Sequence, residues 1–87
     1  MPNDTALGRI QHAARFGQIL LSKHAREEME NARVQARDVQ RAILSASVAL
    51  AQPEGVYRLE GGTAIDGEEL IVVLREIRPG LFVITVF

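Results

Sequence analysis

Two turn signals near the C-terminal end constrain the fold more than any other feature of the sequence. Asp66-Gly67 tolerates the positive φ values of a tight hairpin turn, and Pro79-Gly80 marks a second turn. Around these turns lie three runs rich in apolar residues, at 56–60, 70–74 and 81–87. Because consecutive strands joined by short turns pair antiparallel, the sequence predicts a three-stranded antiparallel β-meander.

Alternation along the last two of these strands makes both faces of the predicted sheet apolar. One face carries Leu70, Val72 and Leu74, and the other carries Ile71 and Val73. The final strand divides in the same way, with Phe82, Ile84 and Val86 opposed to Leu81, Val83 and Phe87. We expect the second and third helices to cover one face. The first helix, strand curvature or another chain would have to cover the other.

The N-terminal half predicts helices interrupted by a short strand. Asp4 or Thr5 can cap a first helix that ends after Phe16, and residues 18–21 read as a brief apolar strand. Ser22 caps a second helix. A third helix follows the apolar spacing of Val39, Ala42, Ile43 and Ala46. The predicted class is α+β, a single domain over 1–87 with two or three N-terminal helices and a short strand before the meander.

Composition excludes several functional classes. Because the chain has no cysteine, disulfides, thiolate zinc sites and cysteine nucleophiles are ruled out. The net charge of −1 lacks the basic excess that is typical of dedicated nucleic-acid-binding proteins. The first residues do not resemble a signal sequence, and no apolar stretch approaches membrane-spanning length. We therefore expect a cytoplasmic protein without a membrane partner.

His24 is the residue most suited to chemistry. It lies in Ser22-Lys23-His24-Ala25, at a predicted strand-to-helix junction where free backbone N–H groups attract anions. A histidine there suits general acid–base catalysis near neutral pH. The alternative is structural, with His24 packed over the junction or bonded to a strand carbonyl. Glu28, four residues on, can face His24, but no third or fourth ligand is evident, so we predict neither a metal site nor a cofactor.

Other polar residues allow both functional and structural interpretations. Arg26, Arg33, Arg37 and Arg41 could contact phosphates, although interleaved carboxylates favour a solvated, salt-bridged helix surface. In the meander, Tyr57 could donate a hydrogen bond or stack on a base, or belong to the core. Thr85 in the last strand could simply reflect β propensity.

From Ser22 to Phe87 the chain resembles the bacterial family called domain of unknown function 4258. The resemblance lies in Ser22-Lys23-His24-Ala25, Met29, Asp38-Val39, Gly61, Asp66-Gly67 and the closing Val83-Ile84-Thr85-Val86-Phe87. That family is grouped with the RelE/ParE-like toxins, so the resemblance implies a RelE-like fold. Relatives in the group include ribonucleases and gyrase poisons, and some members of the family neighbour small antitoxins. The chain departs from the family at Glu28 and Ala32, where arginine is usual.

The resemblance implies a toxin-type, metal-independent ribonuclease of a toxin–antitoxin pair. His24 would act as acid or base, Arg26 or Arg58 would stabilise phosphate charge, and Lys23 and Arg33 would bind substrate. Tyr57 would position or stack, and Thr85 would donate a hydrogen bond. Expected partners are an antitoxin protein, RNA or the ribosome, and a second copy of the chain.

A second hypothesis is a non-catalytic protein-interaction module of the same fold. Its basis is the doubly apolar meander, the near-neutral charge and the glutamate in place of arginine. Such a module would dimerise or bind a partner through its sheet.

Overall fold

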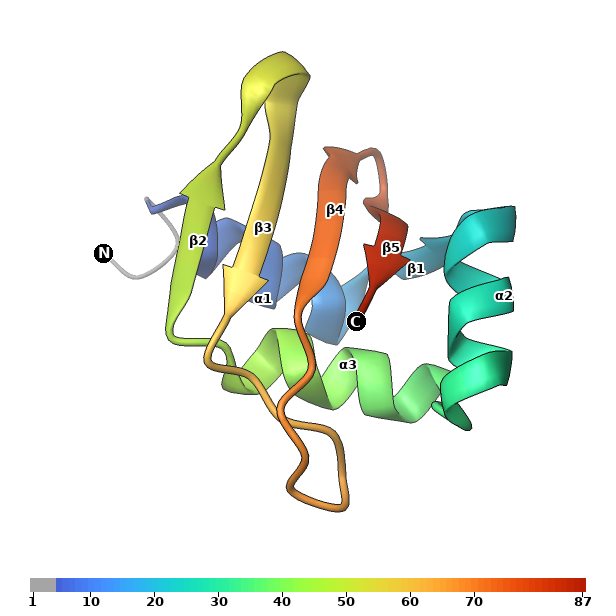
Figure 1. Cartoon of the computed structure of the whole chain (residues 1–87). Helices are drawn as coiled ribbons and strands as arrows, with labels where there is room; N and C mark the ends of the chain where they lie inside the picture. The colour runs from blue at the N-terminus through green and yellow to red at the C-terminus, as the bar shows by residue number, and fades with distance from the viewer. Residues whose placement is uncertain (1–4) are drawn as a thin grey trace.

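The computed structural model describes residues 5–87, which form three α-helices and a five-stranded mixed sheet (Figure 1). The helices are α1 (Ala6–Phe16), α2 (Lys23–Ala32) and α3 (Ala36–Ser45). The strands are β1 (Gln18–Leu21), β2 (Val48–Ala51), β3 (Val56–Glu60), β4 (Val72–Ile77) and β5 (Gly80–Val86), and a short 3-10 turn, η2 (Pro53–Gly55), joins β2 to β3. The predicted cap at Asp4 lies outside the described residues, and the Thr5 side chain caps α1 by accepting from the Gly8 N–H at 2.9 Å.

The α+β class is confirmed, and the predicted three-stranded meander is present as part of a larger, five-stranded mixed sheet. The strand order is β1-β5-β4-β3-β2. The predicted meander forms the antiparallel run β3-β4-β5, to which β2 adds an antiparallel strand and β1 a parallel one. The sequence of β2, Val-Ala-Leu-Ala, gives a weak signal because alanine has low strand propensity. The short strand at 18–21 was predicted, but its parallel pairing with β5 was not. That pairing depends on contacts between residues far apart in sequence.

The loop between β3 and β4 is longer than the predicted hairpin. Its tip holds a turn in which the Gly67 N–H donates to the Ala64 carbonyl at 2.9 Å and Gly67 adopts φ +89°. The strand predicted from Leu70 begins instead at Val72. The loop is held against α3, because the Asp38 carboxylate accepts from the Ile65 N–H at 3.1 Å.

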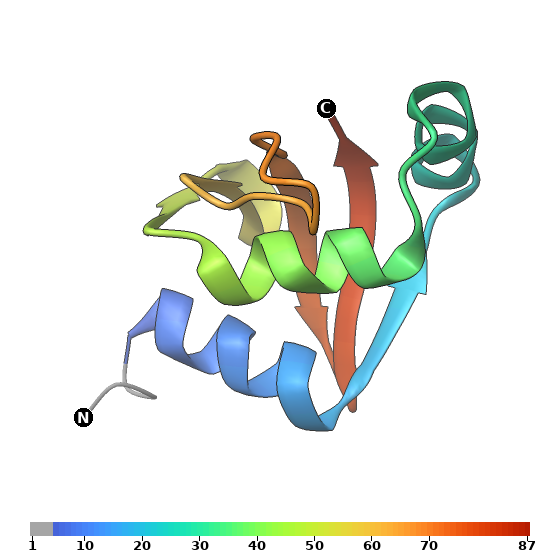
Figure 2. The ribbon, with the colours of Figure 1, turned by 90° about the horizontal axis from the view of Figure 1, so that it is seen from below.

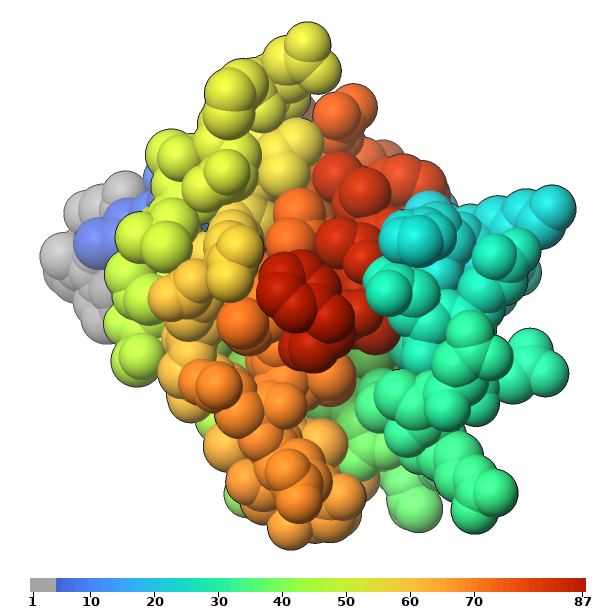
Figure 3. All heavy atoms as spheres, in the orientation of Figure 1, coloured from blue at the N-terminus to red at the C-terminus, as the bar shows by residue number. Residues whose placement is uncertain are grey.

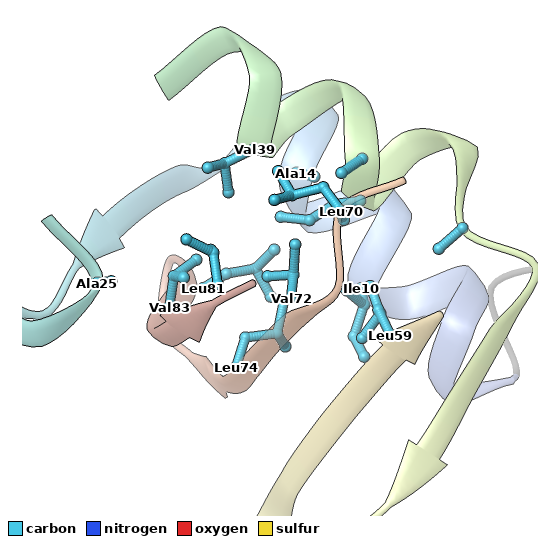
Figure 4. Packing of buried hydrophobic residues seen from close by; sticks show 14 of the residues in the cluster. Ile10, Ala14, Ala25, Val39, Leu59, Leu70, Val72, Leu74, Leu81 and Val83 are labelled. Carbon is cyan, nitrogen blue, oxygen red and sulfur yellow. The ribbon is translucent and has the colours of Figure 1, made fainter. Parts of the chain in front are cut away.

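Helices α1 and α3 cover one face of the sheet, called here the inner face, and α2 stands beside the β1 and β5 edge (Figure 2). The expectation that the second and third helices share a face is therefore wrong. The core lies on the inner face, where α1 contributes the buried Ile10 and Ala14 (Figure 4). The opposite face, called the outer face, has no helix stacked across its centre (Figure 1).

A β-bulge in β5 changes which residues face the core. Val73 pairs with Thr85 and Leu74 pairs with Val83, so Ile84 is the extra residue. Val86 is therefore buried on the inner face, where it lies opposite Val72. The predicted grouping of Val86 with Phe82 and Ile84 was wrong because simple alternation ignores the bulge.

Candidate functional site

On the outer face, a line of paired side chains runs across four strands. Leu50 pairs with Arg58, Arg58 with Val73, and Val73 with Thr85. Directly paired residues share a face, so this row crosses the open side of the sheet. In Figure 3 the dark red C-terminal end of the chain lies at the centre of this side, between the yellow and orange strands and α2.

The start of α2 is fixed to β5 through Ser22. Its side-chain oxygen accepts from the Ala25 N–H at 2.9 Å and donates to the Ile84 carbonyl at 2.6 Å. The Ser22 N–H also donates to the Val83 carbonyl at 2.9 Å. Because Ala25 and Met29 point into the core, these bonds fix the rotation of α2 about its axis.

That rotation brings His24 and Glu28 to the side of Thr85. The distance between His24 Nε2 and Glu28 Oε1 is 3.1 Å, and the Thr85 hydroxyl donates to the same carboxylate oxygen. The His24 side chain is 67% exposed and that of Glu28 is 33% exposed. The His24 ring therefore faces solvent and a carboxylate and is not packed over the junction.

This arrangement has a defined chemical character. The Glu28 carboxylate lies within ion-pairing distance of the His24 ring, one turn away along α2, and it also accepts the hydrogen bond from the Thr85 hydroxyl. The three groups place an exposed imidazole beside a carboxylate that is bonded to the sheet. We call this trio of His24, Glu28 and Thr85 the histidine row.

Arg58 lies on the same face as the histidine row but has partners of its own. Its Nε is 2.7 Å from the Glu60 carboxylate, and its guanidinium carbon lies 5.2 Å from the centre of the Phe87 ring. Two strand spacings separate Arg58 from Thr85, about 10 Å between backbones. The arginine can reach a ligand on the outer face only by turning away from Glu60.

Lys23 and Arg26 share the first turns of α2 with His24. Arg26 is two residues from His24 and so lies about 200° around the helix, on the flank that faces away from the histidine row. Lys23 is the first residue of the helix, beside the Ser22 cap.

Arg33 ends α2 in a left-handed conformation, φ 58°, at the opposite end from His24. It lines a pocket of about 250 Å³ between α2, α3, the 61–71 loop and the end of β5. Three exposed carboxylates line the same pocket, from Asp66, Glu68 and Glu69. This acidic surrounding is unfavourable for a phosphate group.

The fourth carboxylate that lines this pocket, that of Asp38, has a structural role. Its pKa is lowered first by the hydrogen bond from the Gln35 N–H and then by the bond from the Ile65 N–H. The first of these bonds is part of the capping box that begins α3. Asp38 therefore stabilises the start of α3 and holds the 61–71 loop against this helix.

Tyr57 lies on the inner face, opposite to Arg58. It pairs with Leu74 and packs against the core beside α1. The pKa of Arg9 in α1 is raised mainly by Glu76 and to a smaller extent by Tyr57, which is consistent with that position. The sheet therefore separates Tyr57 from the histidine row.

Two residues that lie on or beside the outer face were absent from the predicted site. Glu28 was noted for its four-residue spacing from His24, but its bond to Thr85 depends on the docking of α2 on β5. Phe87 is 56% exposed on the outer face because the bulge turns Val86 inward instead. Nothing in the local sequence signals this bulge.

The described residues contain no group of three or more histidine, cysteine or acidic side chains that could hold a metal ion. No helix within 5–87 is long and apolar enough to cross a membrane. Comparison with known families matches residues 21–87 to the model described as Domain of unknown function (DUF4258). No curated protein and no solved structure matches the chain.

Proposed function

The chain belongs to the family of domain of unknown function 4258, and from this membership we propose that it is a toxin-type endoribonuclease of RelE-like fold that needs no metal ion. The observation that carries the proposal is the histidine row, in which Glu28 and Thr85 hold an exposed His24 beside an open sheet face.

RNA supplies its own nucleophile, so a positioned base can begin the reaction. Nδ1 of His24 takes the proton from a ribose 2′-hydroxyl as the 2′-oxygen attacks the adjacent phosphorus. The 2′-oxygen–phosphorus bond forms and the bond to the 5′-oxygen breaks. The leaving 5′-oxygen takes a proton from the imidazolium or from water. The products carry a 2′,3′-cyclic phosphate and a 5′-hydroxyl.

Glu28 and Thr85 assist this step without touching the RNA. The Glu28 carboxylate, 3.1 Å from Nε2, orients the imidazole and offsets the positive charge that His24 gains, and Thr85 holds the carboxylate in place. Glu28 stands where the family usually has arginine, so the position supports the base here and not the phosphate. Lys23 and Arg58 are the cations with access to the phosphate, Arg58 after release from Glu60.

The test is cleavage of a defined RNA by purified protein, alone and with ribosomes, with product ends identified. We expect His24→Ala to lower the rate at least 100-fold, because general acid–base catalysis contributes about 10²–10⁴-fold. His12→Ala is the matched control, since His12 lies on α1 and packs against the Phe16 ring at 4.9 Å. Glu28→Gln should lower the rate about tenfold or more, and Glu27→Gln should not.

Two results would contradict the proposal. The first is cleavage by His24→Ala at the parent rate, which would place the activity elsewhere or in a contaminant. The second is cleavage of the same sequence with 2′-O-methyl groups at the scissile positions, because that substrate lacks the attacking hydroxyl. A protein of this kind would act in the cytoplasm on messenger RNA, with an antitoxin partner to restrain it.

A second candidate is a non-catalytic module that binds a partner or a second copy through the outer face. Exposed large apolar side chains favour it, because Leu20, Val48, Leu50 and Phe87 all lie on that face. Light scattering between 1 and about 100 μM tests self-association over the range of weak dimers. Leu50→Glu should abolish any dimer that uses this face, and a parent protein that stays monomeric throughout would exclude the dimer.

A further inference from the structure

Strand β1 leaves one edge of the sheet unpaired. Its N–H groups bond to β5 at alternate residues, including the Gln18 N–H to the Pro79 carbonyl at 3.0 Å. In a parallel pair, the backbone groups of the intervening Ile19 and Leu21 therefore point away from β5. Among the described elements none lies beyond β1 on that side (Figure 2).

A groove of about 320 Å³ lies beside this edge, between β1, the end of α1 and the start of α3. Ile19 and Leu21 form its apolar wall, together with Ala14. The two helices that line the groove are joined by a hydrogen bond, in which the Gln40 side chain of α3 donates to the Ala14 carbonyl of α1 at 2.9 Å. A strand added to β1 would place every second side chain over this groove.

The groove is basic. Arg15 and Arg37 line it, and no carboxylate does. Neither arginine forms a salt bridge with any group of residues 5–87. Asp38 follows Arg37 in sequence and interacts with its charge, but its oxygens are bonded to the N–H groups of Gln35 and Ile65 and it does not line the groove.

From these three observations we propose that the β1 edge and its basic groove dock an extended, acidic segment of another protein. The segment pairs its backbone with Ile19 and Leu21, places apolar side chains on the groove wall, and directs carboxylates to Arg15 and Arg37. This surface lies on the inner side of the sheet and does not depend on the proposed RNA cleavage.

A second copy of the chain is a poorer occupant. A two-fold pairing of two β1 edges would bring the same groups together from both copies. Arg15 and Arg37 of one copy would then approach those of the other, and like charges oppose such pairing. The other free edge, β2, contributes no residue to this basic groove.

The test uses two synthetic peptides of alternating sequence, one of valine and glutamate and one of valine and lysine. Binding is followed by backbone amide NMR of the full chain. We expect the glutamate peptide to bind at least tenfold more tightly than the lysine peptide, to shift and protect the Ile19 and Leu21 amides, and to weaken as salt is raised. The double substitution Arg15→Glu with Arg37→Glu should reverse the preference. Arg41→Glu, an exposed change further along α3, should leave it unchanged.

A glutamate peptide methylated on alternate backbone nitrogens separates pairing from charge, because it keeps the carboxylates but cannot complete the ladder. Loss of binding by this peptide supports strand addition, and unchanged binding overturns it. The proposal is also overturned if neither peptide binds at millimolar concentration, if the shifts map to β2 or the outer face, or if Ile19 and Leu21 become protected by self-association without peptide.

Discussion

The assignment of an inner, packed face and an outer, open face can be tested with two leucines on neighbouring strands. Leu59 in β3 is 1% exposed and faces α1 and α3, whereas Leu50 in β2 is 40% exposed and faces outward. Both are leucines in paired strands, so truncation to alanine removes the same atoms. The difference in unfolding free energy between the two variants therefore measures how much more tightly the inner face is packed than the outer face.

The magnitudes follow from burial. Leu59→Ala removes fully buried atoms and leaves a cavity, which should cost about 3 kcal/mol within a usual range of roughly 2–5. Leu50→Ala removes a half-exposed side chain with no cavity, which should cost about 1 kcal/mol or less. For a domain of this size, 1 kcal/mol shifts the melting temperature by about 4–8 °C. We expect a drop of about 12–24 °C for Leu59→Ala and of at most about 8 °C for Leu50→Ala.

The assay is thermal and urea unfolding followed by circular dichroism, at low protein concentration so that self-association does not contribute. If Leu59→Ala does not fold, Leu59→Val gives a smaller step of about 1 kcal/mol on the same face. Equal losses for the Leu50 and Leu59 variants would refute the reasoning, because they would show that something packs on the outer face of the isolated chain.

Three further outcomes follow from single contacts. Ser22→Ala should cost about 1–2 kcal/mol in urea unfolding, because it removes the cap of α2, and Ser22→Thr should restore most of it. Gly80→Ala should cost about 2 kcal/mol or more and speed amide exchange in β1, because a Cβ there would collide with the backbone of Gln18; unchanged exchange would contradict the β1–β5 pairing. Because the pKa of Asp38 is lowered in the folded state, its contribution to stability is present above its ordinary value of 3.8 and is lost as pH falls through the lowered pKa. The melting temperature of the parent should therefore fall more steeply in acid than that of Asp38→Asn, and parallel curves would count against this.

Local signals predicted most of the elements. The spacing of Val39, Ala42 and Ile43 gave the correct helix, and the Ser22 cap gave the correct start of α2. The turn at Pro79-Gly80 gave the hairpin between β4 and β5. These predictions succeeded because capping, helical periodicity and turn chemistry depend on residues only a few positions apart.

The candidate site was only partly predictable. The sequence placed His24 at a helix start and Glu28 one turn later, and both positions are as expected. Phe87, Thr85 and Val86 could not be placed, because one extra residue in β5 reverses which side chains point inward. Tyr57 and Arg58 are neighbours in sequence and lie on opposite faces, so only one of them can share the face of the histidine row.

By itself, the sequence determined that this chain makes N-terminal helices and a set of hairpin-linked strands, because those choices are made within a few residues. The tertiary structure decided that α1 and α3 share the inner face, that β1 joins β5 in parallel, and that the outer face and the β1 edge remain open. These outcomes depend on which apolar surfaces bury each other best across the whole chain, a competition between contacts far apart in sequence.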